Sequence, residues 1–281
     1  MLIIKTIAEI KNHLVPKKNA AQKIALVPTM GALHDGHLAL VKKARELAEI
    51  VVVSIFVNKS QFNDLNDYEK YPRQIDSDLE KLKTCGVDYV FLPSDEEIFS
   101  QDFSVKITPT NLVNCLCGAF RAGHFDGVAL IITKLFNIIK PDVALFGQKD
   151  FQQVAVIKKL VTDLNFDVEI FAHETVREKT GLAMSSRNQR LDEMSFAKAA
   201  IIYQILFEIR NEIKISPESV VKILSEKKEK LLKNGFEKID YLEIRDERNL
   251  KLITNFIPSQ PARILIALYL SKVRLIDNLQ I

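Results

Sequence analysis

Two apolar runs with an amphipathic stretch between them limit the folds open to this chain of 281 residues. The first run covers residues 23–27 and ends at Pro28, and the second covers residues 50–57. Between them, over residues 40–48, apolar residues recur at helical spacing. This order predicts a βαβ unit, and the continuous second run is typical of a strand buried on both faces of a parallel sheet.

The same alternation continues along the chain. Helices are predicted at 76–84, 127–140 and 151–162, and strands at 88–92, 143–146 and 166–171. Strands that alternate with helices predict an α/β fold with a doubly wound parallel sheet.

The pattern changes near residue 175. Long helical patterns cover residues 195–214 and 217–233, and residues 239–244 and 263–270 alternate like strands of a small sheet. Segregated helices and strands predict a smaller α+β domain, so we expect one domain over 1–175 and a second over 176–281.

Composition excludes several classes of protein. The net charge is only +3 and Lys and Arg are not clustered, which argues against a nucleic-acid partner. No apolar stretch approaches the roughly 18 residues of a membrane span. Residues 1–5 lack the features of a signal peptide, so we expect a cytoplasmic protein with no membrane partner.

The three cysteines are Cys85, Cys115 and Cys117. An odd number argues against a disulfide framework. Cys115-x-Cys117 has no second Cys/His pair at zinc-site spacing. Buried or half-buried free thiols are therefore predicted.

The loop after the first predicted strand, residues 28–37, has the features of an anion site. Gly31 and Gly36 let the backbone approach a ligand, and the following helix N-terminus favours negative charge. His34 and His37 add two imidazoles, and no P-loop pattern is present. Two other interpretations are a helix cap and a pair of metal ligands, although no third ligand is evident nearby.

His34-x-Gly36-His37 resembles the signature of the nucleotidylyltransferase superfamily related to class I aminoacyl-tRNA synthetases. Further segments narrow the resemblance to the pantothenate synthetase (pantoate–β-alanine ligase) family and extend it over essentially the whole chain. These segments are residues 27–31, 54–62, 121–128, 134–142, 146–153, 184–188 and 274–278.

The resemblance implies a two-step ligation of pantoate with β-alanine to give pantothenate. Pantoate attacks ATP to form pantoyl adenylate and diphosphate, and β-alanine then displaces AMP. ATP is thus a substrate, Mg²⁺ is expected with it, and no metal ligand is assigned in the protein. The resemblance also implies a Rossmann-like N-terminal domain, a C-terminal lid domain and a homodimer.

The resemblance assigns most of the site to ATP. His37, His34 and Lys149 are the implied catalytic residues, with His37 as a proton donor to the phosphates. The implied ATP-binding residues are Met30, Gly31, Ala32, Leu33, His34, Asp35, Gly36, His37, Gly147, Gln148, Lys149, Asp150, Val176, Met184, Ser185, Ser186 and Arg187.

Two glutamines are implied to select the acid. Gln61 and Gln153 bind pantoate by resemblance, and Gln61 also borders the β-alanine site. A neutral pocket suits this role, because a fixed cation would blunt the nucleophilicity of the attacking carboxylate. The adjacent Gln152 is expected to face away.

Several of these residues have a second interpretation. Asp150 either accepts a ribose hydroxyl or caps the next helix, and these roles are compatible. Val176 either contacts the nucleotide through its backbone or is a core valine. Asp78 either joins the water shell of Mg²⁺ or is a surface helix carboxylate. Arg121 and His124 either contact an anion or lie at a subunit interface.

Two other functions compete with ligation. A nucleotidylyltransferase that stops at adenylyl or cytidylyl transfer would share the first loop, but has no need for the pair Gln61 and Gln153. A non-catalytic nucleotide-binding module would have no need to keep both histidines and Lys149.

Overall fold

The computed structural model describes residues 1–281, which divide into two compact units. Unit 1 comprises residues 1–111, 121–148 and 153–174. Unit 2 comprises residues 112–120, 149–152 and 175–281. All residues from 175 onward thus belong to unit 2, and the two short earlier segments 112–120 and 149–152 also pack with it.

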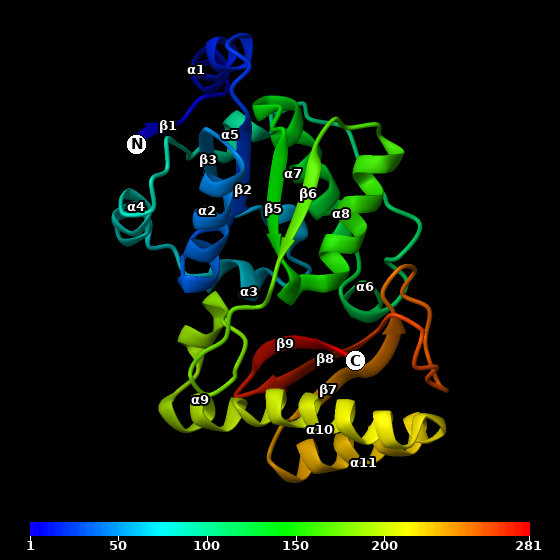
Figure 1. Ribbon diagram of the computed structural model, residues 1–281. Coiled ribbons are helices and arrows are strands. Elements are labelled where there is room, and N and C mark those ends of the chain that lie inside the picture. The colour runs from blue at the N-terminus through cyan, green and yellow to red at the C-terminus, as the bar shows by residue number, and fades with distance from the viewer. The chain divides into compact units, whose positions relative to one another are not determined.

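Unit 1 is built on a six-stranded sheet in which all strand pairs are parallel. The strands are β1 (Leu2–Ile4), β2 (Ile24–Thr29), β3 (Ile50–Ile55), β4 (Tyr89–Phe91), β5 (Val143–Gly147) and β6 (Glu169–His173). Their order is β1-β4-β3-β2-β5-β6. Figure 1 shows β2, β3, β5 and β6 side by side with helices flanking them.

The strand order reverses direction at β2. From β2 the chain moves outward to β3 and β4, and it later returns to place β5 on the other side of β2. Ala25 of β2 accordingly pairs with Val51 of β3 on one side and with Val143 of β5 on the other. In open α/β sheets, ligands bind where the order reverses, outside the carboxyl ends of the strands. The loops that follow β2 and β5 occupy that position.

The helices of unit 1 cover this sheet. They are α1 (Ile7–Asn19), α2 (Asp35–Leu47), α3 (Leu65–Glu69), α4 (Ile75–Lys83), α5 (Asp95–Ile98) and α7 (His124–Ile139), with a 3-10 turn η1 (Lys59–Gln61). Leu40, Val41 and Ala44 of α2 pack in one core with Val51 and Val53 of β3. Because β3 is buried along its whole length, it has the continuous apolar sequence of a central parallel strand.

The chain passes between the units in η2 (Gln148–Asp150) and in α8 (Phe151–Asp163), which begins in unit 2 and continues in unit 1.

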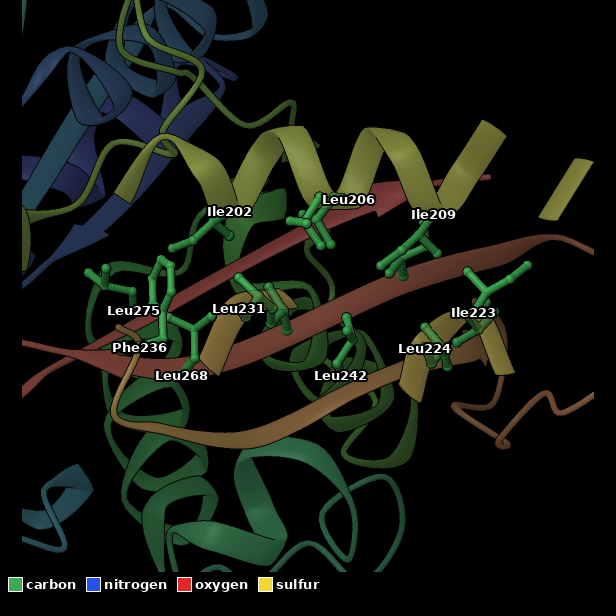
Figure 2. Packing of buried hydrophobic residues seen from close by; sticks show 14 of the residues in the cluster. Ile202, Leu206, Ile209, Ile223, Leu224, Leu231, Phe236, Leu242, Leu268 and Leu275 are labelled. Carbon is green, nitrogen blue, oxygen red and sulfur yellow. The ribbon is translucent and has the colours of Figure 1, made fainter. Parts of the chain in front are cut away.

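Unit 2 consists of helices on an antiparallel sheet of order β7-β8-β9. Its elements are α6 (Leu116–Phe120), η3 (Ser186–Arg190), α9 (Glu193–Ala199), α10 (Ile201–Ile215), η4 (Pro217–Ser219), α11 (Val220–Lys233), β7 (Lys238–Asp246), β8 (Ala262–Leu270) and β9 (Val273–Gln280). Figure 2 shows Ile202, Leu206 and Ile209 of α10 directed toward the sheet, at the spacing of one helix face. Together, the two units confirm the predicted fold class.

Several predicted elements have different bounds in the structure. The helix predicted over 195–214 is two helices that meet at Ala200. The strand predicted from residue 166 begins at Glu169. The backbone N–H of Phe166 instead donates to Val161 O at 3.0 Å, and Asn165 has φ 53°. This hydrogen bond and the left-handed conformation of Asn165 end α8, so the backbone N–H of Phe166 is not available to pair in the sheet.

No helix is long and apolar enough to cross a bilayer. The three cysteines are free, with Cys117 buried and Cys85 and Cys115 half-buried, which confirms the predicted thiols.

Candidate active site

The loop after β2 has a backbone conformation that depends on glycine. Gly31 has φ 79° and Ala32 has φ 51°, so two consecutive residues lie in the left-handed region. A Cβ on Gly31 would lie 3.1 Å from Oδ2 of Asp78 and 3.2 Å from Cγ2 of Ile55. Both the positive φ and the tight space therefore favour glycine at position 31.

The carboxylate of Asp78 anchors this loop through hydrogen bonds to the loop backbone. Its side chain is fully buried, Oδ2 accepts the backbone N–H of Ala32 at 2.8 Å, and Oδ1 accepts that of Leu33 at 2.7 Å. Lys81 Nζ donates to the carbonyl of Leu33 at 2.7 Å. The interpretation of Asp78 as a surface helix carboxylate is wrong, because the residue faces the loop from the first turn of α4. Both of its oxygens bind backbone N–H groups.

His34 and His37 form a capping box at the start of α2. Nδ1 of His34 accepts the backbone N–H of Gly36 at 3.2 Å, and Nδ1 of His37 accepts that of His34 at 3.3 Å. A neutral imidazole that accepts at Nδ1 carries its proton on Nε2. The two rings, 4.1 Å apart between centroids, thus have their N–H donors on Nε2, at a helix N-terminus that favours anions. Capping therefore fixes the tautomer of both neutral rings.

The Gln61 side chain is fixed at both ends. Asn58 Nδ2 donates to Gln61 Oε1 at 3.1 Å, and Gln61 Nε2 donates to Met30 Sδ at 3.1 Å. Asn58 is itself buried, and its Nδ2 also donates to the carbonyl of Gly127 at 3.0 Å. The amide of Gln61 consequently lies against Met30. Met30 is the first residue of the loop between β2 and α2, residues 30–34, which we call the glycine loop.

Arg121 and His124 hold the backbone of the same segment. His124 Nδ1 lies 2.8 Å from the carbonyl oxygen of Gln61, and Arg121 Nη1 lies 3.1 Å from His124 Nε2. Since a guanidinium only donates, Nε2 of His124 accepts and Nδ1–H donates to Gln61. Gly127 permits the close approach, because a Cβ there would lie 2.4 Å from the backbone of Ser60. These contacts give Arg121 and His124 a role inside unit 1.

The two neighbouring glutamines of α8 differ. Gln152 is buried, and its Nε2 donates to the carbonyls of Leu112 at 2.7 Å and Cys115 at 2.8 Å. Its Oε1 accepts the backbone N–H of Cys117 at 2.9 Å. Gln153 is half-buried and makes no side-chain hydrogen bond within the chain. Gln153 is thus the one whose amide is available to a ligand.

Lys149 follows β5 by two residues and packs with unit 2. Its Nζ lies 3.4 Å from Oδ2 of Asp150, and its side chain is 17% exposed. The backbone carbonyl of Lys149 accepts from Nδ2 of Asn278 in β9 at 2.9 Å.

The segment 176–187 forms a hairpin followed by a 3-10 turn. The backbone N–H of Met184 donates to Val176 O at 3.0 Å, and Ser185 caps the turn by accepting from the N–H of Arg187 at 3.3 Å. Val176 is half-buried rather than a core valine. Arg177, next to it, is paired with Asp277 of β9 through bonds of 2.6 and 3.0 Å. Burial raises the pKa of Asp277, and the hydrogen bonds from Arg177 oppose that shift.

A pocket of about 230 Å³ opens beside the glycine loop in unit 1. Its lining includes Met30, Gly31, Tyr68, Arg73 and Asp78.

The predicted site residues therefore fall into two groups, one within each unit. Residues 30–37 and Gln61 lie together in unit 1, and Lys149 and residues 176–187 are both attached to β9 in unit 2. Asn58, Asp277 and Asn278 were not among the predicted site residues. Their only sequence signal is a polar residue inside an otherwise apolar stretch.

Comparison with known proteins decides the family. The family described as pantoate-beta-alanine ligase matches residues 2–280. The chain belongs to this family of ligases. It is 45% identical over 279 residues to the pantothenate synthetase of Fervidobacterium nodosum, covering 99% of each chain. It is 44% identical over 287 residues to that of Pseudomonas aeruginosa, covering 100% of this chain and 99% of the relative.

Solved structures of the family have the same fold. The pantothenate synthetase of Thermus thermophilus superposes with a TM-score of 0.92 at 38% identity, covering 100% of this chain and 99% of that one. The pantoate-beta-alanine ligase of Francisella tularensis, solved in complex with beta-gamma ATP and beta-alanine, has a TM-score of 0.83 at 36% identity. That match covers 100% of this chain and 97% of the other. Family membership makes the chain an enzyme, a pantoate–β-alanine ligase.

Proposed function

We propose that this ligase joins pantoate to β-alanine through a pantoyl-adenylate intermediate, with ATP as the activating substrate. The observation that carries the proposal is the contact between Gln61 and Met30, at 3.1 Å. It places an amide suited to a hydroxy acid against the loop whose following helix N-terminus suits a phosphate. An adenylation requires that the site for the carboxylic acid adjoin the site for the phosphates, because the carboxylate attacks the α-phosphorus. The ATP complex of the Francisella tularensis relative supports the choice of nucleotide.

In the first step, a carboxylate oxygen of pantoate attacks the α-phosphorus of ATP. A new P–O bond forms, the bond from the α-phosphorus to the bridging oxygen breaks, and diphosphate leaves with the electron pair. We assign His34 and His37 to this step, because Nε2–H donors beside a helix N-terminus stabilise charge on the leaving phosphates. Lys149 supplies a further positive charge, and Gly147 lets the backbone approach the nucleotide.

In the second step, the amine of β-alanine attacks the acyl carbon of the adenylate. The C–N bond forms, the C–O bond to AMP breaks, and the amine loses a proton. We assign Gln61 and Gln153 to pantoate, with Gln61 also bordering β-alanine. We assign the Met184–Arg187 segment to the triphosphate, where it would exclude water from the hydrolysable intermediate.

The remaining nucleotide assignments follow the same resemblance. Asp35, Gly36, Gln148, Asp150 and Val176 complete the proposed ATP site, together with residues 30–33. The proposal also includes a homodimer in the cytoplasm and a domain boundary at residue 175.

Magnesium accompanies ATP, but this chain offers no cluster of ligands for it. No group of three or more His, Cys, Asp or Glu side chains is arranged to hold a metal ion. Asp78 does not fit the role, since both its oxygens accept backbone hydrogen bonds from Ala32 and Leu33. We therefore assign no step of the reaction to a metal held by the protein.

The test is AMP formation by the purified protein from ATP, pantoate and β-alanine, with pantothenate measured by mass spectrometry. We expect stoichiometric AMP, diphosphate and pantothenate only when both cosubstrates are present. Consumption of ATP with diphosphate release but without an amide product would refute ligation and favour a nucleotidylyltransferase.

A further inference from the structure

Asn278 in β9 is a buried amide with both ends in use. Its Oδ1 accepts from Arg263 Nη1 at 2.7 Å, so its Nδ2 is the end that donates to the carbonyl of Lys149 at 2.9 Å. Arg263 is itself fixed, with its guanidinium stacked on the ring of Phe151 at 4.4 Å. The orientation of the Asn278 amide is therefore determined, and it holds the backbone of Lys149.

Asp277, the preceding residue, holds a second segment. It is 3% exposed and receives two hydrogen bonds from Arg177, at 2.6 and 3.0 Å. Arg177 also donates to the carbonyls of Gly181 at 3.1 Å and Asn278 at 3.2 Å, and it stacks on Tyr203 at 4.0 Å. One guanidinium thus joins the hairpin at 176–184 to β9.

The hairpin continues directly into the Met184–Arg187 segment. Arg177 pairs with Ala183 across the hairpin, and Asn188 Nδ2 donates to the carbonyl of Ala183 at 3.1 Å. The two adjacent residues of β9 therefore hold both segments that the proposed function assigns to ATP within unit 2.

We propose that Asp277 and Asn278 are positioning residues for ATP, which set Lys149 and the 176–187 segment in one rigid frame. This inference rests on the proposed function. Its physical basis is that burying a carboxylate and an amide costs free energy that an apolar pair would not. Their contacts go to Lys149, Arg177 and Arg263, whereas the sheet has an apolar core of its own.

The chain contains a matched control for these residues. Asp246 in β7 is also a buried carboxylate paired with an arginine, Arg248, at 2.7 Å. Its other partners are Gln260 and the backbone N–H of Arg248, so it touches neither ATP segment. Asp246→Asn therefore removes a buried charge from the same sheet without affecting the proposed frame.

The experiment compares Asn278→Asp, Asp277→Asn and Asp246→Asn with the wild type, using calorimetric titration with a non-hydrolysable ATP analogue. Asn278→Asp keeps the shape and the acceptor for Arg263 but removes the donor to Lys149. Losing one such buried bond corresponds to about a tenfold weaker affinity for the analogue, which we expect for both β9 variants. The KM for pantoate should stay within about twofold, and Asp246→Asn should bind the analogue like the wild type.

Hydrogen–deuterium exchange supplies a second readout that does not depend on activity. Deuterium uptake over 149–153 should rise in Asn278→Asp, and uptake over 176–187 should rise in Asp277→Asn. Folded β9 variants with wild-type ATP affinity would overturn the positioning role even if the wild type is a fully active ligase. Equal losses of ATP affinity in all three variants, or unchanged exchange in both segments, would also overturn it. A wild-type protein that makes no pantothenate yet loses ATP affinity in the β9 variants would refute only the proposed reaction.

Discussion

Leu33 and Asp78 are separated by 45 residues, yet the backbone N–H of Leu33 donates to Oδ1 of Asp78 at 2.7 Å. The other carboxylate oxygen accepts from Ala32, so one buried side chain satisfies two successive N–H groups. Those groups belong to the loop in which Gly31 and Ala32 have positive φ. The conformation of the proposed phosphate loop thus depends on a carboxylate from a different helix.

Asp78→Asn should destabilise this loop and weaken ATP binding. The amide keeps one acceptor but turns an NH2 group toward the second backbone N–H, which leaves a buried donor unpaired. We expect a loss of about 1–3 kcal/mol in the free energy of unfolding, together with a raised KM for ATP. Asp76→Asn is the control, because Asp76 is exposed on the same helix turn. Urea unfolding of both variants checks the prediction, and equal stabilities would contradict it.

His37 has a capping role and a proposed chemical role, which two substitutions separate. His37→Gln keeps a side chain suited to the third position of a capping box, whereas His37→Ala removes it. We expect both variants to lose about 100-fold or more in adenylation rate, since neither carries the imidazole that is proposed to donate a proton to the phosphates. Only the alanine variant should lose about 1 kcal/mol of stability. Single-turnover adenylation and ATP affinity are measured side by side, and equal losses in both would show that His37 only binds.

Gln152 and Gln153 should behave differently although they are adjacent. Gln153→Ala is expected to raise the KM for pantoate about tenfold with ATP affinity largely kept, as loss of a ligand hydrogen bond implies. Gln152→Ala removes the side-chain hydrogen bonds to Leu112, Cys115 and Cys117 and should lower the melting temperature instead. Steady-state kinetics and thermal unfolding of both variants test this pair. Wild-type pantoate kinetics in Gln153→Ala would refute its assignment.

Asp246 provides a test of stability against pH. Hydrogen bonds from Arg248 lower the pKa of Asp246 below its ordinary value of 3.8. A lowered folded-state pKa means that the ionised group stabilises the fold above pH 3.8, and that this contribution is lost as the pH falls through the folded-state value. The stability difference between wild type and Asp246→Asn should therefore be constant from pH 5 to 7 and shrink below about pH 4. Denaturant unfolding at several pH values measures it, and a difference that grows toward low pH would contradict the pairing.

The sequence predicted the central part of the fold because its strands are buried on both faces. Residues 50–57 contain one polar residue, Ser54, and the structure places β3 there, beside β2. Helical spacing over 40–48 likewise predicted the buried face of α2. The glycine loop was predicted as a ligand site because two glycines and two histidines within ten residues are more than a helix cap alone needs.

Long-range polar contacts were not predictable in the same way. Asp78 shares a helix face with Ile75 and Leu82, but a carboxylate that follows Asp76 and Ser77 is by residue type expected at the surface. Its burial depends on a loop 45 residues away. Residues 273–280 were not predicted as a strand, because the adjacent polar residues Asp277 and Asn278 interrupt the alternation. The contacts of those two residues with Arg177 and Lys149 explain why polar residues occupy a buried strand.

The most direct test of the central claim follows an oxygen atom. Pantoate labelled with ¹⁸O in its carboxylate is incubated with the protein, ATP and β-alanine, and the AMP and phosphate products are analysed by mass spectrometry. A pantoyl adenylate requires that one labelled oxygen of the attacking carboxylate leave with the phosphorus, so AMP should carry one ¹⁸O per pantothenate formed. Label in inorganic phosphate or diphosphate, with unlabelled AMP, would contradict the adenylate mechanism.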